Sequence, residues 1–193
     1  MKNILILAGP SGVGKTTIAH ALLDGSEAFE LVRSVTTRAP RGDAFDAEYI
    51  YLTRAEMEKL ISNGGVIEYT EYAGNLYGTP HSEIDRISTE GKTPLLILDL
   101  NGVHTVMNAK SDITPCAIYL TVPEATLEAR LSARYGKDKE KLFSRLNQNK
   151  LDLAEYEKIK SDFFATVENS GNVGKCAEEV INLFSVFKSK FQI

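Results

Sequence analysis

Residues 9–17, GPSGVGKTT, combine glycines, a lysine and two threonines in an order that can bind phosphate groups. The segment Gly9–Thr16 fits the pattern G-x-x-x-x-G-K-[ST], whose glycines let successive backbone N–H groups point toward one anion. The apolar run Ile4–Ala8 before it predicts a buried strand, and the helix expected after it adds the positive end of its dipole. The pattern predicts a nucleoside triphosphate site, with Lys15 on the outer phosphates and the Thr16 hydroxyl on Mg²⁺.

A second stretch with anion-binding side chains, SVTTRAPR, covers residues 34–41. Arg38 and Arg41 lie three residues apart, and the proline between them keeps the segment extended, so the pair is not one face of a helix. Guanidinium groups bind phosphate oxygens in a bidentate manner, which favours a second phosphate site; two solvated surface arginines are the alternative. Tyr49 and Tyr77 supply phenolic donors nearby in the sequence.

Apolar runs alternate with helical patterns along the chain, which predicts an α/β fold with a mainly parallel sheet. The expected strands of the core are Ile4–Ala8, Leu95–Leu98, Ala117–Thr121 and Phe163–Val167. The expected helices are Lys15–Leu23, Gly102–Ala109, Pro123–Tyr135 and Lys175–Lys188. We expect one core with two appendages, and no second domain.

The first appendage, residues 34–91, is expected to form a small and partly antiparallel insertion. It contains the run Tyr49-Ile50-Tyr51, a helix opened by the capping box Thr53–Glu56, a strand at Val66–Tyr72, a turn at Gly74-Asn75 and a helix capped by Thr79-Pro80. Alternation along the second strand puts Glu68 and Glu71 on opposite faces, so only one of them can line a site. The second appendage, residues 135–157, is charged and strongly helical.

Bulk composition limits the class of protein. The chain has 193 residues, of which 43% are hydrophobic and 25% charged, as in ordinary soluble globular proteins. A net charge of −4 argues against a nucleic-acid binder held by a general basic field. Cys116 and Cys176 fit no metal or redox spacing and are expected to be buried, reduced thiols. The N-terminal apolar run is too short for a signal peptide or a membrane span, so a cytoplasmic protein with no membrane partner is expected.

Five segments in this order resemble guanylate kinase over almost the whole chain: GPSGVGKTT, SVTTRAPR, VIEYTEY, GNLYGT and LLILDLNG. The resemblance implies a P-loop nucleoside monophosphate kinase that transfers a phosphoryl group from MgATP to GMP, giving ADP and GDP. It also implies three parts within a single domain, residues 1–193. These are a P-loop NTPase-type core of parallel sheet flanked by helices, a small mixed α+β GMP-binding insertion at 34–91, and a helical lid at 135–157. The core would comprise residues 1–33, 92–134 and 158–193.

The resemblance further implies the residues of both sites. The ATP site would contain Gly9, Pro10, Ser11, Gly12, Val13, Gly14, Lys15, Thr16 and Thr17, with Asn169 near the adenine. The GMP phosphate would be clamped by Arg38, Arg41, Tyr49 and Tyr77, and the base bound by Ser34, Glu68, Thr79 and Asp99. The catalytic groups would be Lys15 and Arg38 together with the arginines that close on the transferring phosphoryl group, Arg130, Arg134 and Arg145.

The chemistry of four of these positions agrees with the resemblance. A carboxylate such as Glu68 accepts hydrogen bonds only, which suits the N1–H and N2 amino donors of guanine; a solvated strand carboxylate is the alternative. Asp99 follows a buried strand, and ligands bind at the carboxyl ends of such strands in open α/β sheets. Arg130 and Arg134 lie four residues apart on one helix, where like charges repel unless they share an anion or face solvent.

One position departs from the family pattern. The family ends this strand as D-x-D, whereas the first of the two positions is Ile97 here, so Asp99 is the only acid. Other readings of the chain are a catalytically inactive interaction module, a related kinase acting on a sugar bisphosphate such as ribose 1,5-bisphosphate, and a P-loop hydrolase. The intact phosphate loop argues against the inactive module. Arg38 and Arg41 would have no explanation in a hydrolase, so they argue against that reading. Oligomeric state and the use of dGMP in place of GMP stay open.

Overall fold

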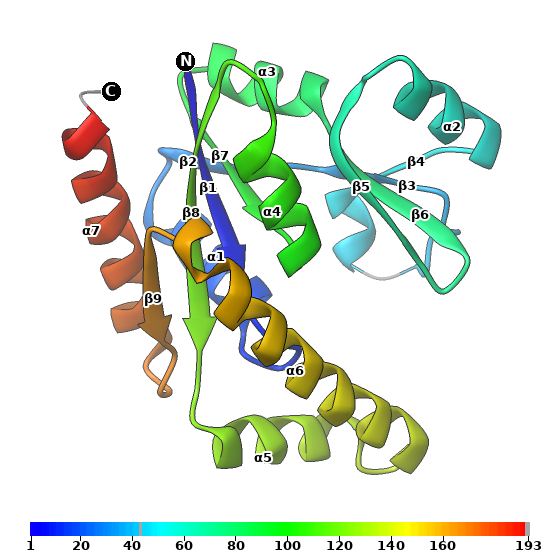
Figure 1. Cartoon of the computed structure of the whole chain (residues 1–193), viewed down its shortest axis with the longest axis vertical. Helices are drawn as coiled ribbons and strands as arrows, with labels where there is room; N and C mark the ends of the chain where they lie inside the picture. The colour runs from blue at the N-terminus through cyan, green and yellow to red at the C-terminus, as the bar shows by residue number, and fades with distance from the viewer. Residues whose placement is uncertain (43, 192–193) are drawn as a thin grey trace.

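The core of the protein is a five-stranded sheet. The structure, a computed structural model, describes residues 1–42 and 44–191. In sheet order β2-β7-β1-β8-β9, the strands are Phe29–Leu31, Thr93–Ile97, Lys2–Ala8, Ile113–Thr121 and Ala165–Glu168. Every pairing between neighbours in this sheet is parallel (Figure 1), which confirms the predicted α/β architecture.

The central strand β1 is apolar on both faces because helices cover both sides of the sheet. Leu5 and Leu7 pack in one hydrophobic cluster, and Ile4 and Ile6 pack in the other, all with no exposed surface. A strand buried on both faces reads as a continuous apolar run rather than an alternating one. The run ends at Ala8, where the chain leaves the sheet for the phosphate loop, Gly9–Thr16.

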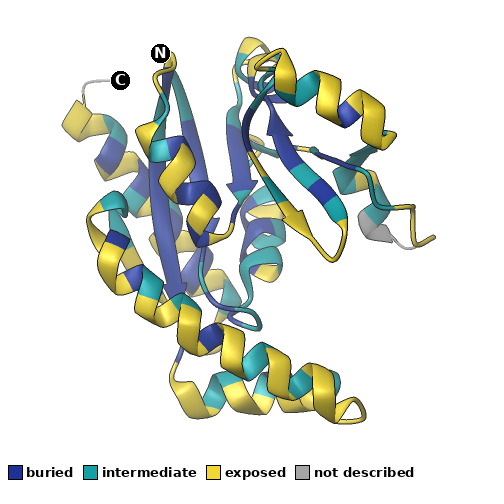
Figure 2. Cartoon of the chain, turned by 45° about the vertical axis from the view of Figure 1, so that its right-hand side comes forward, coloured by how far each residue is buried: buried dark blue, intermediate teal, exposed yellow. Residues whose placement is uncertain are grey.

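Two pairs of helices form the outer layers. On one face lie α1 (Lys15–Gly25) and α7 (Val173–Phe191), and on the other lie α3 (His81–Thr89) and α4 (Leu100–Asn108). Two more helices, α5 (Glu124–Tyr135) and α6 (Lys139–Ile159), extend beyond the sheet (Figure 1), and the short 3₁₀ helix η2 (Lys160–Asp162) follows α6. Most of α5 and α6 is exposed in Figure 2, and α6 confirms the helix expected within residues 135–157.

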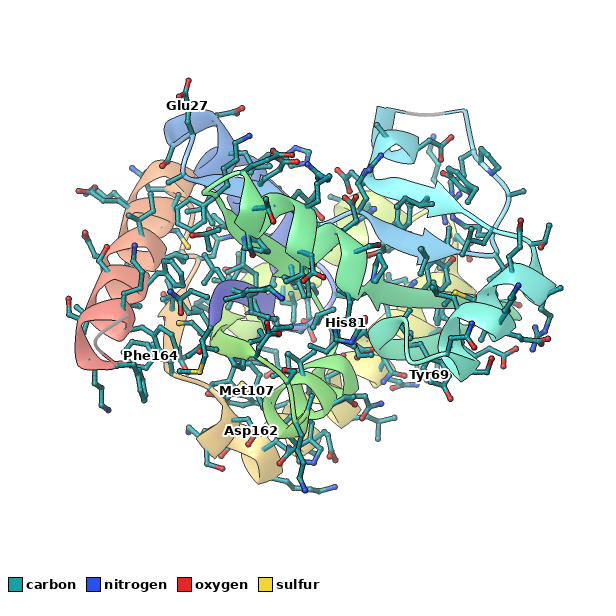
Figure 3. The ribbon with its side chains drawn as sticks, turned by 90° about the horizontal axis from the view of Figure 1, so that it is seen from above. Glu27, Tyr69, His81, Met107, Asp162 and Phe164 are labelled. Carbon is teal, nitrogen blue, oxygen red and sulfur yellow. The ribbon has the colours of Figure 1, made fainter. Side chains whose placement is uncertain are left out.

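A second sheet forms the insertion. In sheet order β4-β3-β6-β5, its strands are Tyr49–Tyr51, Ser34–Thr36, Asn75–Pro80 and Val66–Tyr72. Helix α2 (Arg54–Ser62) and the 3₁₀ helix η1 (Ala44–Glu48) complete it. Val35, Met57 and Leu76 form its small hydrophobic cluster, and the predicted capping box is present in both directions between Thr53 and Glu56. Figure 3 places His81, the first residue of α3, between this insertion and the core.

The structure differs from the expected elements at short connections. The strands β2 and β3 are only three residues long, too short to show a pattern in the sequence. The hairpin turn lies at Ala73-Gly74 rather than Gly74-Asn75, since these two residues have φ of 50° and 75°, as a two-residue turn requires. Thr79 does not cap α3; it lies in β6, and its hydroxyl bonds elsewhere.

The expected burial of the two cysteines is confirmed. Cys116 and Cys176 are free thiols in the core, and burial raises the pKa of Cys116 to about 12. In the part of the chain that the structure describes, no helix has the length and apolarity needed to cross a membrane.

Candidate active site

The phosphate loop requires glycine at its start and at its end. A Cβ on Gly9, whose φ is 146°, would lie 2.4 Å from the carbonyl oxygen of Leu120. Gly14, with φ of 104°, is the N-cap of α1, and a Cβ there would lie 2.6 Å from Nδ2 of Asn169. Only a residue without a side chain fits these contacts and backbone angles. The loop therefore packs against the core while its N–H groups lie at the start of α1.

Arg130 and Asn169, which are predicted to bind ligand, also form hydrogen bonds that support the phosphate loop. The carbonyl oxygen of Val13 accepts hydrogen bonds from Nη1 of Arg130 at 3.0 Å and from Nδ2 of Asn169 at 2.8 Å. Arg130 also donates to the carbonyl of Asn169 at 3.2 Å. Asn169 is only 3% exposed, and its Oδ1 is buried with no hydrogen-bond partner among the described residues. Arg130 and Asn169 thus hold the loop in shape before any ligand is considered.

A cavity of about 450 Å³, the donor cavity, opens above the loop. Its walls include most of the predicted donor residues: Ser11, Gly12, Gly14, Lys15, Thr16, Thr17, Arg130, Arg134 and Asn169. Three cationic side chains and the N-terminus of α1 face one space, which favours an anionic ligand.

Lys15 is held within the loop. Its Nζ donates to the carbonyl oxygens of Gly9 at 2.7 Å and of Pro10 at 3.2 Å. Burial lowers the pKa of Lys15 to about 8, although the charges of Asp152 and Asp99 oppose this shift. A lysine in this state gains charge stabilisation when a phosphate enters the cavity.

The predicted acceptor clamp lines a second cavity, of about 670 Å³, here called the acceptor cavity. Arg38, Arg41, Tyr49 and Tyr77 come from the insertion, and Thr16, Thr17 and Arg134 come from the core. The last three residues also line the donor cavity. Val173 of α7 lines both cavities as well, so the two predicted phosphate sites adjoin at the first turn of α1, Arg134 and Val173. Such proximity is what phosphoryl transfer needs.

Asp46 organises this clamp, although the sequence analysis did not single it out. Its carboxylate accepts hydrogen bonds from the backbone N–H of Arg41 at 2.9 Å, from the N–H of Gly42 at 2.7 Å and from the Tyr51 hydroxyl. The Arg38 guanidinium lies 3.5 Å away. The Tyr51 bond, with these N–H groups, lowers the pKa of Asp46 to about 2. No sequence signal identifies this role of Asp46, because a carboxylate five residues after an arginine is a common arrangement.

Arg38 is also held by aromatic rings. Its Cζ lies 5.2 Å from the centre of the Tyr49 ring and 5.8 Å from that of Tyr51. Tyr49 and Tyr77 meet edge to face with centroids 6.4 Å apart. These contacts keep the guanidinium at the wall of the acceptor cavity, since an arginine above two rings has fewer orientations to explore.

Glu68, Thr79 and Asp99 form a separate polar group. Glu68 is 7% exposed, and its Oε1 accepts a hydrogen bond of 2.5 Å from the Thr79 hydroxyl. Burial raises the pKa of Glu68, and the charge of Asp99 adds to that effect. Asp99 caps α4 by accepting from the N–H of Gly102 at 2.7 Å.

Gly102 lets the two carboxylates come close together. A Cβ at this glycine would lie 3.3 Å from Oδ1 of Asp99 and 3.3 Å from Oε2 of Glu68. The neighbouring carboxylates of Glu68 and Asp99 both accept hydrogen bonds, so they suit a ligand that presents two hydrogen-bond donors along one edge. Ser34, the other predicted base contact, begins β3 in the insertion sheet, where it pairs in register with Tyr49.

The prediction that Glu68 and Glu71 face opposite ways agrees with their environments. Glu71 is exposed and lies 3.6 Å from Arg54 on α2. The pairing of β5 with β6 shifts between Val66 and Glu68, so Ile67 and Glu68 are both buried although they are adjacent. Strict alternation is therefore wrong for the first residues of this strand.

A third cavity, of about 750 Å³, runs between the loop, α4 and α6 and is called the cleft here. Lys15, Ile97, Asp99, Arg145 and Asp152 line it. The half-buried Ile97 presents a hydrocarbon wall at the position where the sequence resemblance implied a carboxylate. Asp152 of α6 is the largest favourable charge acting on Lys15, so the cleft keeps a second acid from another element.

Arg134 and Arg145 are placed by neighbouring tyrosines. Arg134 lies over the ring of Tyr135 at 5.3 Å. Arg145 donates to the Tyr72 hydroxyl at 2.8 Å, and its Cζ is 5.6 Å from the centre of that ring. Because Tyr72 belongs to β5, this bond joins α6 directly to the insertion.

Comparisons with known proteins match these features to one family. A family model described as guanylate kinase matches residues 1–185. Among similar proteins, a guanylate kinase of Lactobacillus delbrueckii subsp. bulgaricus is 37% identical over 153 residues, spanning 78% of this chain and 74% of that protein. One of Sus scrofa is 36% identical over 152 residues, spanning 77% and 76%. One of Streptomyces coelicolor is 34% identical over 187 residues, spanning 95% and 91%.

A solved structure shows the same fold. The crystal structure of guanylate kinase from Anaplasma phagocytophilum superposes with a TM-score of 0.70 at 26% sequence identity. The match covers 96% of this chain and 85% of that one, so it includes the core, the insertion and the exposed helices.

Proposed function

The chain belongs to the guanylate kinase family, and we infer that its two adjoining phosphate sites serve one reaction, in which ATP phosphorylates GMP to give ADP and GDP. The chain is accordingly an ATP-dependent nucleoside monophosphate kinase. The observation that supports the reaction most directly is that the donor and acceptor cavities share four lining residues, Thr16, Thr17, Arg134 and Val173. Because the cavities adjoin, phosphates bound in the two of them would lie close together, as direct transfer between them requires.

We propose that catalysis depends on position and charge rather than on a general base, because the acceptor is already a phosphate oxygen. Lys15 and Arg134 would stabilise the charge on the transferring group, while Arg38 and Arg41 hold the acceptor phosphate. Arg145 would contribute from the cleft, where it lies on the same cavity as Lys15. Arg130 would act on the donor site mainly through its hydrogen bond to the loop carbonyl of Val13.

We propose that Mg²⁺ enters with ATP and takes the Thr16 hydroxyl as its protein ligand. This hydroxyl lies in the first turn of α1 and lines both cavities, so its position fits an ion shared with the phosphates. Mg²⁺ keeps several waters and uses one or two protein oxygens beside substrate phosphates, so one hydroxyl is enough. The bound ion would neutralise charge on the phosphate oxygens.

The division of the chain follows from these roles. We propose that residues 34–91 bind GMP and that residues 135–157 form the lid over ATP, with the rest as the core. The base of GMP would meet Glu68, Thr79 and Asp99, and its phosphate the clamp of Arg38, Arg41, Tyr49 and Tyr77. Asn169, which lines the donor cavity, would lie beside the adenine.

A substrate panel tests the function. ADP release from ATP should be measured with GMP, AMP, CMP, UMP and ribose 1,5-bisphosphate as acceptors in separate reactions. We expect release with GMP to exceed that with every other acceptor, because only guanine offers two adjacent donors to Glu68 and Asp99. Release that needs no acceptor would indicate a hydrolase, and preference for the sugar bisphosphate would contradict a guanine site.

The pKa of Lys15 predicts proton uptake when ATP binds near pH 8. With a pKa of about 8 in the empty loop, Lys15 is charged below that pH and neutral above it. Phosphate oxygens favour the charged form, so ATP should raise this pKa and its affinity should fall as the pH rises from 7 to 9. Calorimetry at pH 8 in buffers of different ionisation enthalpy measures the uptake directly.

The control for this experiment is a Lys15→Met variant, which has no proton to gain there. Equal proton uptake by the two proteins would show that another group titrates. Absence of uptake in the wild type would contradict the proposed contact between Lys15 and the phosphates.

A further inference from the structure

Asn149 is a buried polar side chain on an otherwise exposed helix. Most residues of α6 that lie outside its last turns are exposed or half-exposed, whereas Asn149 is 7% exposed. Figure 1 shows α6 leaving the core beside β9 and running out below the insertion sheet. A buried amide costs free energy unless its donor and acceptor are both satisfied.

The partner of Asn149 is the phosphate loop. Its Oδ1 accepts from the backbone N–H of Ser11 at 2.9 Å, and its Nδ2 donates to the carbonyl oxygen of the same residue at 3.0 Å. These two bonds fix the peptide groups on both sides of Ser11, directly before Gly12, whose φ is 88°. Among neutral side chains only an amide offers a donor and an acceptor in this arrangement.

Helix α6 also contacts the insertion, the part of the molecule that is proposed to bind GMP. Arg145 lies four residues before Asn149, one turn away on the same side of α6, and bonds to Tyr72 of the insertion. Ser11 and Arg145 line the cleft together with Lys15. The distance from the loop to Arg145 is therefore set by one rigid helical turn, provided that Asn149 keeps its two bonds.

We propose that Asn149 is a positioning residue that holds the phosphate loop in its binding shape and places Arg145 at the cleft. The proposal rests on the proposed ATP site and deepens it. Asn149 touches no substrate; it acts through the Ser11 backbone and through α6. It also makes this turn of α6 a fixed point, so that lid motion involves the part of the helix before it.

The experiment compares Asn149→Leu with Asn147→Leu. Leucine has the same number and branching of side-chain heavy atoms as asparagine but leaves the Ser11 N–H and carbonyl unpaired, whereas Asn147 is exposed on the same helix. We expect Asn149→Leu to weaken MgATP binding, measured by calorimetry without GMP, by roughly 5- to 100-fold, the effect of unpairing a buried polar group. The Asn147→Leu variant should bind as the wild type does.

A kinetic measurement separates positioning from general destabilisation. For Asn149→Leu, KM for ATP should rise and kcat fall, while KM for GMP stays within about two-fold of wild type, because the acceptor clamp lies on the insertion. Ile87→Val, on the buried face of α3, removes one buried methyl group and serves as the stability control. It should change neither KM.

Either of two results would overturn the proposal about Asn149. One is MgATP binding by Asn149→Leu within about two-fold of the wild type. The other is an equal loss of MgATP affinity in Ile87→Val. If Asn149→Leu does not fold, Asn149→Ala is measured in the same way and judged by the same limits. A wild type that binds MgATP but does not phosphorylate GMP would refute the proposed function alone, since the binding comparison would still test Asn149.

Discussion

Replacing Lys15 with methionine is expected to lower kcat for GMP phosphorylation by about 10²- to 10³-fold, the usual cost of removing one group that stabilises transition-state charge. Lys15 is the only cationic side chain of the phosphate loop itself, and it lines both the donor cavity and the cleft. Its depressed pKa means that the folded protein disfavours its charge until a phosphate is present. Methionine should therefore not destabilise the empty fold, and circular dichroism and the thermal midpoint should show no loss.

The matched control is Lys110→Met, which removes an exposed lysine from the connection between α4 and β8. Turnover by this variant should equal that of the wild type. Near-wild-type turnover by Lys15→Met would contradict the proposed kinase mechanism. An unfolded Lys15→Met protein would instead contradict the argument that the buried ammonium group does not stabilise the empty state.

Replacing Glu68 with glutamine is expected to lower kcat/KM for GMP by about 2–4 kcal/mol of transition-state stabilisation, the cost of breaking a buried charged hydrogen bond. Glutamine keeps the shape of the side chain but exchanges one acceptor oxygen for a donor, which would face a guanine N–H. Glutamine has only one side-chain oxygen. It can replace either the Glu68 oxygen that accepts from Thr79 or the Glu68 oxygen that lies near Gly102, but not both. Steady-state kinetics with GMP as the varied substrate measures the loss.

The wild type should discriminate strongly against adenine at the same site. Adenine has an acceptor at N1 and no amino group at C2, so AMP would leave the buried Glu68 charge unpaired. Sites built on such hydrogen bonds reject an analogue that lacks them by roughly 10⁴- to 10⁵-fold. The Glu71→Gln variant is the control, because Glu71 is exposed and lies beside Arg54. Equal effects of the two substitutions, or equal use of AMP and GMP, would show that Glu68 does not read the base.

Local pattern was sufficient to predict the phosphate loop and the core that holds it. The loop motif depends on the backbone freedom of a few adjacent glycines, and the buried strand before it depends on a run of apolar residues. Both are short-range properties, so the donor site was predicted with its strand and helix. The separation of Glu68 from Glu71 also followed from strand geometry. The short strands β2 and β3 were missed, because three residues carry no measurable periodicity.

Contacts between distant segments were decided only by the tertiary structure. Asp46 beside Arg38, Gly102 between Glu68 and Asp99, and Asn149 on Ser11 each depend on where whole elements pack. Nothing near Asn149 in the sequence marks it, since it is an asparagine on a charged helix, 138 residues from its partner. The sequence by itself determined which residues are predicted to bind phosphate, because that prediction depends on local chemistry. The fold decided which side chains hold those residues in place, because the required partners meet only when the helices and sheets pack together.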